Sequence, residues 1–115
     1  MKRLWRATIN SWNGLIAATQ SEQAFREELV VLAIGAPLVF FLTADPGWRF
    51  ALIGSLVFLL IVELLNTALE KLSDRVSLAQ DPALKRVKDM GSAAILLSLM
   101  LAGALWIWIV AVKIF

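Results

Sequence analysis

The chain has 115 residues, of which 60% are hydrophobic, and a formal net charge of +2 at pH 7. This hydrophobic share exceeds the roughly 45–50% of an ordinary soluble domain, so the composition predicts one integral-membrane domain over residues 1–115. With no cysteine and no histidine, disulfides, thiolate chemistry, imidazole bases and the usual zinc sites are excluded. Any catalytic base must be a carboxylate or a lysine.

The spacing of apolar and polar side chains in residues 1–22 predicts an amphipathic helix that lies in the membrane interface. Four apolar side chains, Trp5, Ile9, Trp12 and Ile16, recur at helical spacing, and basic and amide side chains occupy the other faces. Tryptophan favours headgroup depth, and basic amphipathic helices bind there. A soluble helix docked on the rest of the protein is the alternative, and both place this segment at the cytoplasmic surface.

Three apolar segments follow, and we expect transmembrane helices over about residues 24–44, 48–70 and 91–113. The last two approach the roughly 20 residues that span a hydrocarbon core. The first is shorter and contains Pro37, near which we expect a bend. The predicted fold class is an all-α membrane protein with three transmembrane helices and an N-terminal interfacial helix.

The positive charges lie unevenly around these segments. Most precede the first span or lie between the second and third: Lys2, Arg3, Arg6, Arg26, Lys71, Arg75, Lys85, Arg86 and Lys88. Arg49 and Lys113 fall on the other side. The positive-inside rule therefore places the N-terminus and the second connection in the cytoplasm, and Asp45-Pro46-Gly47 is expected to form a tight turn on the outer side.

Small and aromatic residues of the third span are expected to serve packing and anchoring. Ala94, Ser98 and Ala102 form a ridge at i, i+4 and i+8 that lets another helix approach closely. The tryptophans near the outer side are expected to be interface anchors: Trp48, Trp106 and Trp108.

One face of the second span is polar. At about 100° per residue, Glu63, Asn66, Glu70 and Asp74 fall within about 60° of one another. A solvated surface would account for Asp74 and Glu70 but not for Glu63, which follows twelve apolar or small residues. An acidic residue at membrane depth is costly, so the pattern marks Glu63 as a functional candidate.

Two further runs bring polar groups to the same level of the membrane. Upstream, "SEQAFREE" contains Glu22, Arg26 and Glu28; downstream, "KDMGSAA" contains Lys88, Asp89 and Ser92. An isolated Asp or Ser near a helix start is an ordinary N-cap, but the convergence of three segments favours a site. Carboxylates without histidine or cysteine favour Mg²⁺, which commonly binds one or two carboxylates plus substrate phosphates, as phosphoryl transfer requires. The chain has no P-loop or Rossmann motif.

The runs "EQAFREE", "VELLNTALEKLSD" and "KDMGSAA", in this order and with three spans, resemble the bacterial integral-membrane diacylglycerol kinases, a family that includes undecaprenol kinases. The resemblance covers nearly the whole chain. It implies ATP-dependent phosphorylation of 1,2-diacylglycerol to phosphatidic acid in the bacterial inner membrane, with Mg²⁺ accompanying ATP. It also implies a homotrimer whose active sites are shared between subunits, with no nucleic-acid partner.

The resemblance also implies a role for each matching residue. Glu63 is then the general base, and Glu22 and Glu70 hold the metal. The ATP-binding residues are Arg3, Asn10, Glu22, Glu70, Lys88 and Asp89, with Asn66 and Asp74 as supporting polar groups. The lipid-binding residues are Arg3, Ser11, Trp12, Phe25, Arg26, Glu28, Glu63 and Ser92. Asn10 departs from the aromatic residue that the best-known member has at this position.

Two rival functions remain open from the residues alone. Undecaprenol kinase activity would use the same mechanism, because both lipids offer a primary hydroxyl on an apolar body. A small proton-coupled transporter would use Glu63 as its carrier carboxylate, but it leaves Glu22, Glu70, Lys88 and Asp89 unexplained.

Overall fold

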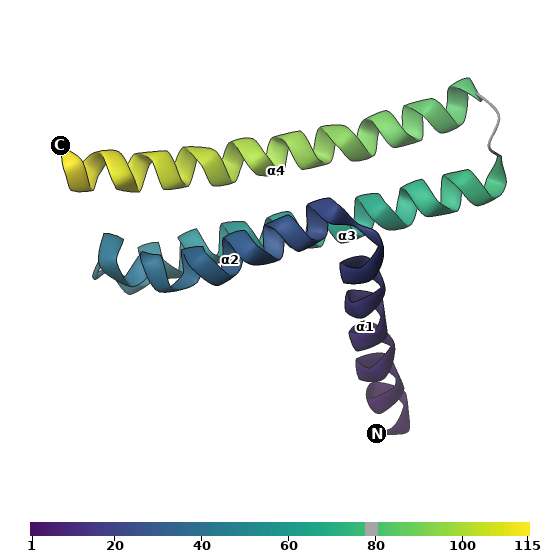
Figure 1. The fold of residues 1–115 in the computed structure, drawn as a ribbon, viewed down its shortest axis with the longest axis horizontal. Helices are drawn as coiled ribbons and strands as arrows, with labels where there is room; N and C mark the ends of the chain where they lie inside the picture. Colours follow the sequence, from purple (N-terminus) through teal and green to yellow (C-terminus); the bar gives the residue numbers. More distant parts are fainter. Residues whose placement is uncertain (78–80) are drawn as a thin grey trace.

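The computed structural model describes residues 1–77 and 81–115, and the secondary structure within them is entirely helical. The helices are α1 (Lys2–Ser21), α2 (Gln23–Leu42), α3 (Pro46–Val76) and α4 (Pro82–Ile114). Helices α2, α3 and α4 lie alongside one another, and α1 projects away from them (Figure 1). The all-α class expected from the sequence is confirmed.

An aspartate–proline pair opens each of the two long helices. Asp45 is the N-cap of α3, and its carboxylate accepts a hydrogen bond of 2.8 Å from the backbone N–H of Gly47. Pro46 takes the first helical position, where its missing N–H costs nothing. Asp81 and Pro82 begin α4 in the same way. The tight turn expected at Asp45-Pro46-Gly47 is therefore a helix start, and the chain reverses in the short link before it.

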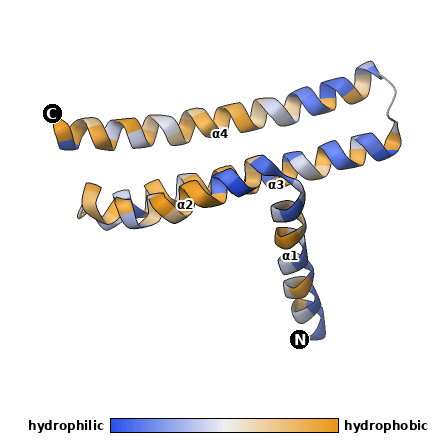
Figure 2. Cartoon of the chain, in the orientation of Figure 1, coloured by the Kyte–Doolittle hydropathy of each residue, from blue (hydrophilic) through white to orange (hydrophobic). Residues whose placement is uncertain are grey.

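Helices α3 and α4 continue beyond the predicted spans 48–70 and 91–113. They have 31 and 33 residues, and both are long and apolar enough to cross a membrane. Their added turns are polar and flank the connection between them (Figure 2). The sequence prediction ended with the apolar run, whereas the backbone keeps its helical hydrogen bonds through the polar turns beyond it.

Helix α2 corresponds to the first predicted span, and it passes through Pro37 without ending. Its first two turns contain Arg26, Glu27 and Glu28. They leave an apolar stretch of about 21 Å, short of the roughly 30 Å hydrocarbon core. Among the described helices, α2 therefore lacks the apolar length that α3 and α4 have.

Two apolar clusters hold the helices together. The first, formed by Ala18, Phe25 and Leu60, packs the junction of α1 and α2 against α3. We call this junction, residues 19–26, the elbow. The second cluster, at the other end of the bundle, contains Val39, Leu52 and Ile109.

Trp106 packs into the bundle instead of anchoring its outer surface. Its indole N–H lies 3.3 Å from the carbonyl oxygen of Leu52 and 3.2 Å from Ser55 Oγ. The prediction for Trp106 was wrong because a tryptophan near a helix end can turn towards a neighbouring helix as readily as towards lipid. Ser98 and Ala102 of the small-residue ridge are buried, as packing requires, whereas Ala94 is exposed and does not pack within the chain.

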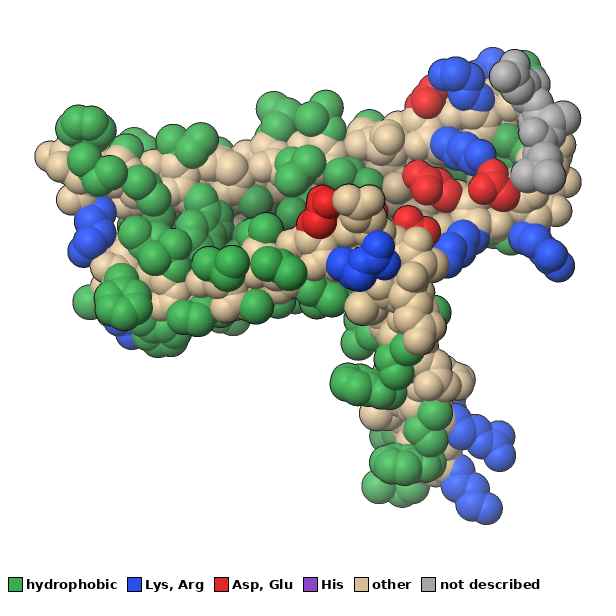
Figure 3. Space-filling view, viewed as in Figure 1, with side chains coloured by type: hydrophobic (Ala, Val, Ile, Leu, Met, Phe, Trp, Pro, Cys, Tyr) green, Lys and Arg blue, Asp and Glu red, His purple; other side chains and the backbone are tan. Residues whose placement is uncertain are grey.

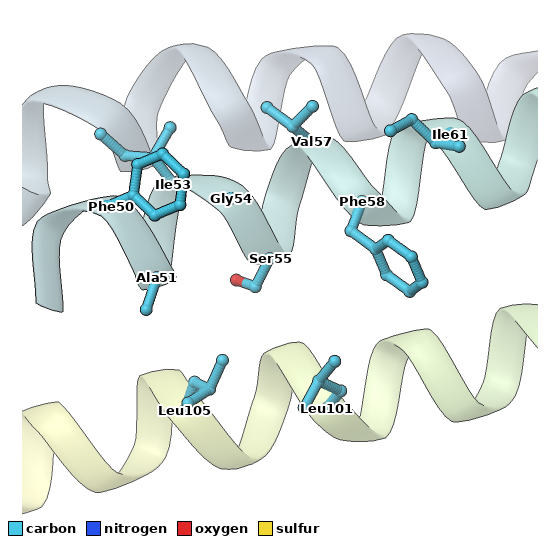
Figure 4. Close-up of a pocket in the computed structure, with 10 residues that line it drawn as sticks. All are labelled: Phe50, Ala51, Ile53, Gly54, Ser55, Val57, Phe58, Ile61, Leu101 and Leu105. Carbon is cyan, nitrogen blue, oxygen red and sulfur yellow. The ribbon is translucent and has the colours of Figure 1, made fainter. Parts of the chain in front are cut away.

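Large hydrophobic side chains cover much of the surface around the bundle (Figure 3). Between α3 and α4 they also line a groove of about 650 Å³, whose walls include Phe50, Phe58 and Leu101 (Figure 4). This groove contains no titratable side chain. It is therefore suited to apolar contacts and not to chemistry.

Gly35 provides a test of the packing among α2, α3 and α4. A Cβ at Gly35 would lie 2.8 Å from Leu56 Cδ1 and 3.3 Å from the ring of Trp106. Gly35→Val should therefore lower the free energy of unfolding by about 1–3 kcal/mol through overpacking. The control is Gly54→Val, because no described side chain lies within 4 Å of a Cβ there. Equal thermal unfolding midpoints for the two variants in detergent would contradict this packing.

Candidate functional site

The elbow presents a glutamate at the break between two helices. Glu22 is the single extended residue between α1 and α2, with φ −122° and ψ 114°. It occupies the N-cap position of α2, but its side chain makes no capping hydrogen bond. The half-buried carboxylate of Glu22 is therefore free to interact with groups outside its own helix.

Four glutamates gather where the elbow meets α3. Glu63 is only 6% exposed, and both Glu22 and Glu70 repel its carboxylate electrostatically. Glu28, one and a half turns into α2, is in turn repelled by Glu63. Acidic side chains gather near the point where α1 leaves the bundle (Figure 3). We call Glu22, Glu28, Glu63 and Glu70 the glutamate cluster.

Asn66 lies beside this cluster and orients one of its members. Its side chain is 6% exposed, and its Nδ2 donates a hydrogen bond of 3.0 Å to Glu70 Oε1. Asn66 Oδ1 and Glu28 Oε2 are buried without a hydrogen-bond partner in the described part of the chain. Unpaired buried polar atoms are rare and costly, so they mark a place that a bound molecule or ion would complete.

The glutamate cluster fits a hard cation. Within residues 1–77 and 81–115, the ion pairs are Lys85–Asp89 and Lys88–Asp74, and neither neutralises the cluster. No group of three or more acidic side chains in these ranges is arranged to hold a metal by itself. Two of these carboxylates could hold a hard cation only together with oxygen ligands from another molecule.

Basic side chains lie beyond the cluster, on the polar ends of α3 and α4. Lys88 Nζ of α4 donates to Asp74 Oδ1 of α3 at 2.5 Å, and Lys85 pairs with Asp89 at 2.8 Å. Ser92 is exposed one turn further along α4. The N-cap of α4 is Asp81, so the alternative that Asp89 or Ser92 only caps this helix is wrong.

The predicted site residues of α1 are not brought to the cluster of their own chain. Arg3, Asn10, Ser11 and Trp12 are exposed on the projecting helix, and the hydroxyl of Ser11 donates to a carbonyl of that helix. The side chain of Trp5 is 68% exposed and that of Trp12 65%. The alternative of a helix docked along the bundle is therefore wrong.

The two elbow residues expected to bind lipid have structural contacts. Phe25 is 1% exposed in the cluster with Ala18 and Leu60, and together with Trp12 it lines a groove of about 430 Å³. Arg26 Nη1 donates to the carbonyls of Thr19 and Gln20 at the end of α1. Both residues stabilise the elbow, and the groove leaves one side of it open.

A third groove, of about 620 Å³, runs between α2, α3 and α4. Its walls are mainly apolar, among them Val31, Leu38, Leu99 and Trp106, and Glu28 lies at its elbow end. It suits a molecule with an apolar body and a polar end group.

Gly91 is a residue that the sequence reasoning missed. It is buried, and a Cβ at this position would clash with Oδ1 of Asn66. Only glycine therefore lets α4 approach Asn66 so closely. A glycine inside a helix, which costs about 1 kcal/mol relative to alanine, was the available signal.

Comparison with known proteins gives a consistent result. Residues 9–110 match the model of the family described as prokaryotic diacylglycerol kinase. A diacylglycerol kinase of Pseudomonas aeruginosa is 41% identical over 106 residues, 92% of this chain and 86% of the relative. One from Escherichia coli is 38% identical over 104 residues, 90% and 85% of the two chains. One from Haemophilus influenzae is 34% identical over 106 residues, 92% and 90% of the two chains.

The close approach at Gly91 makes a specific prediction. Gly91→Ala should displace the Asn66 amide, break its hydrogen bond to Glu70 and lower the free energy of unfolding by about 1–3 kcal/mol. Asn66→Ala removes the obstacle, so the double variant should be no less stable than Asn66→Ala alone. Thermal unfolding of the four proteins in detergent measures this coupling. The control is Gly103→Ala, where a Cβ meets no described side chain within 4 Å; an equal loss there would contradict the explanation.

Proposed function

We propose that this chain, which belongs to the prokaryotic diacylglycerol kinase family, phosphorylates 1,2-diacylglycerol with ATP to give phosphatidic acid. The observation that carries the proposal is the buried carboxylate of Glu63, 6% exposed among three other glutamates. A carboxylate at that depth can meet a lipid hydroxyl at the boundary between acyl chains and headgroups. The polar ends of α3 and α4 then face the water from which ATP arrives.

Glu63 acts as the general base of the transfer. It takes the proton of the lipid hydroxyl while that oxygen attacks the γ-phosphorus of ATP, and the bond to the departing ADP breaks. Glu70 lies two turns along α3, about 10 Å nearer the water. Glu70 and Glu22 would hold the Mg²⁺ that accompanies ATP, and the ion would neutralise phosphate charge. Asn66 orients Glu70 through its 3.0 Å hydrogen bond.

From the α4 side, Lys88 binds the phosphates of ATP and Asp89 binds the metal–nucleotide complex. Asp74 holds Lys88 by the ion pair between α3 and α4. A lysine placed in this way can stabilise negative charge on the transferred phosphoryl group. Glu28 and Ser92 bind the lipid headgroup, and the groove that ends at Glu28 takes an acyl chain.

The remaining site residues come from a neighbouring subunit of a homotrimer. Arg3 lies about 27 Å along α1 from Ser21, where α1 ends, because a helix rises about 1.5 Å per residue. It cannot reach the glutamate cluster of its own chain. A neighbour's α1 would bring Arg3, Asn10, Ser11 and Trp12 to the ATP and lipid, while Phe25 and Arg26 shape the elbow beside them.

The protein spans the bacterial inner membrane three times, with α2 as the first span. The uneven distribution of basic residues supports a cytoplasmic N-terminus and a cytoplasmic connection between α3 and α4. Helix α1 lies in the interface, with its exposed tryptophans at headgroup depth. With α2 as a span, its short apolar length supports a position of the elbow and the glutamate cluster close to the headgroups.

Undecaprenol kinase activity is the second candidate, because an apolar groove with a carboxylate at its end accepts either lipid. The two are separated by offering both lipids in mixed micelles and following labelled γ-phosphate from MgATP. Preferential labelling of diacylglycerol supports the proposal. If folded protein labels neither lipid, the kinase proposal fails and proton transport through Glu63 becomes the function to test.

Glu63→Gln should lower the rate of phosphate transfer by at least about 10²-fold, because a general base typically contributes 10²- to 10⁴-fold. The protein should remain folded and should still bind ATP. The matched control is Asp45→Asn at the other end of α3, where an amide oxygen can still accept the N-cap hydrogen bond from Gly47. A wild-type rate for Glu63→Gln would remove Glu63 from the role of base.

Mixed trimers test whether α1 serves a neighbour's site. A triple variant with Arg3→Ala, Asn10→Ala and Trp12→Ala should be inactive alone, as should Glu63→Gln. Unfolding the two together and refolding them should restore activity, because some sites combine an intact α1 with an intact cluster. Mixing Glu63→Gln with Glu22→Gln should restore none, since both glutamates belong to one chain's cluster. Absence of activity in every mixture would contradict the shared site.

A further inference from the structure

Two cationic side chains fix the elbow. Arg26 acts within it: its Nη1 donates to the carbonyl oxygens of Thr19 and Gln20 at 2.9 and 3.3 Å. Lys71 acts from α3: its Nζ donates to Ser21 Oγ at 2.7 Å, across 50 residues of chain. Arg26 therefore stabilises the bend itself, whereas Lys71 ties the bend to α3.

The Lys71–Ser21 hydrogen bond has a glutamate beside each partner. Glu22 follows Ser21, and Glu70 precedes Lys71. Glu22 is a single extended residue whose side chain caps no helix, so its position follows that of Ser21. Glu70 is held from the other side by Asn66. The hydrogen bond therefore ties together the two residues to which we assign the divalent cation.

Electrostatic repulsion works against a closed elbow, and such a tie opposes it. Glu22 and Glu70 both repel Glu63, and no ion pair in the described part of the chain neutralises these carboxylates. The repulsion favours an elbow that opens away from α3. The apolar cluster around Phe25 opposes that opening at one side, and Lys71 opposes it at the polar side.

We propose that Lys71 is a positioning residue: by donating to Ser21, it holds Glu22 near Glu70 and raises the affinity of this pair for a divalent cation. The inference rests on the proposed function for the roles of Glu22 and Glu70. The direction in which cation affinity changes when Lys71 is removed distinguishes this role from a simple charge effect. A lysine that acted only through its charge would repel the cation, and removing it would tighten binding.

The test is a direct measurement of cation binding. Mn²⁺, which electron paramagnetic resonance detects, replaces Mg²⁺ and is titrated into the full chain in detergent with a non-hydrolysable ATP analogue. Lys71→Met and Ser21→Ala should each weaken Mn²⁺ binding about 5-fold, as expected for one lost hydrogen bond. The double variant should be no weaker than either single variant, and Lys71→Arg should keep most of the affinity.

The controls separate this inference from the proposed function. Arg75→Met removes a positive charge from an exposed position on the same helix and should leave Mn²⁺ binding unchanged or tighter. Glu22→Gln should weaken it by more than Lys71→Met does. If only Glu22→Gln weakens it, the role of Lys71 is wrong and the kinase proposal stands. If Glu22→Gln has no effect, Glu22 is not a ligand, and the role of Lys71 falls with that assignment. Phosphate transfer to lipid, measured separately, still decides the kinase proposal.

Discussion

The burial of a carboxylate among like charges is the constraint on which the rest of this structure depends. Glu63 is almost fully buried in a helix apolar enough to cross a membrane, and such a group persists only where it is paired or used. Several elements of the fold together form the surroundings of Glu63. The elbow contributes Glu22, the second turn of α2 contributes Glu28, the polar face of α3 contributes Glu70, and α4 closes one side. A cation or a proton held between them removes the repulsion.

The parts that local geometry determines could be predicted from the sequence. Glu63, Asn66 and Glu70 share one helical face because their spacing of three and four residues matches the helical repeat. The hydrogen bond from Asn66 to Glu70 and the burial of Glu63 confirm that face. The order of the four helices was also predictable, because apolar runs of that length form helices in either lipid or a protein core.

The parts that depend on how helices approach one another were not predictable. The sequence around Trp106 does not show whether this side chain packs against another helix or anchors in the interface. Lys71 resembles any lysine on a solvated helix end. Its contact with Ser21 exists only because the elbow comes back to α3. The direction of α1 likewise follows from one extended residue, Glu22, whose conformation no local pattern specified. The polar turns that lengthen α3 and α4 were missed because hydropathy does not report helix length in water.

The contact between Gly91 and Asn66 restricts the order in which this protein can change during evolution. Any side chain at position 91 meets the amide oxygen of Asn66, while that amide also orients Glu70. A lineage can therefore accept a larger residue at position 91 only after position 66 has become smaller. The reverse order passes through a misplaced Glu70. The two positions lie on different helices, and we expect them to change as a pair, with position 66 changing before position 91.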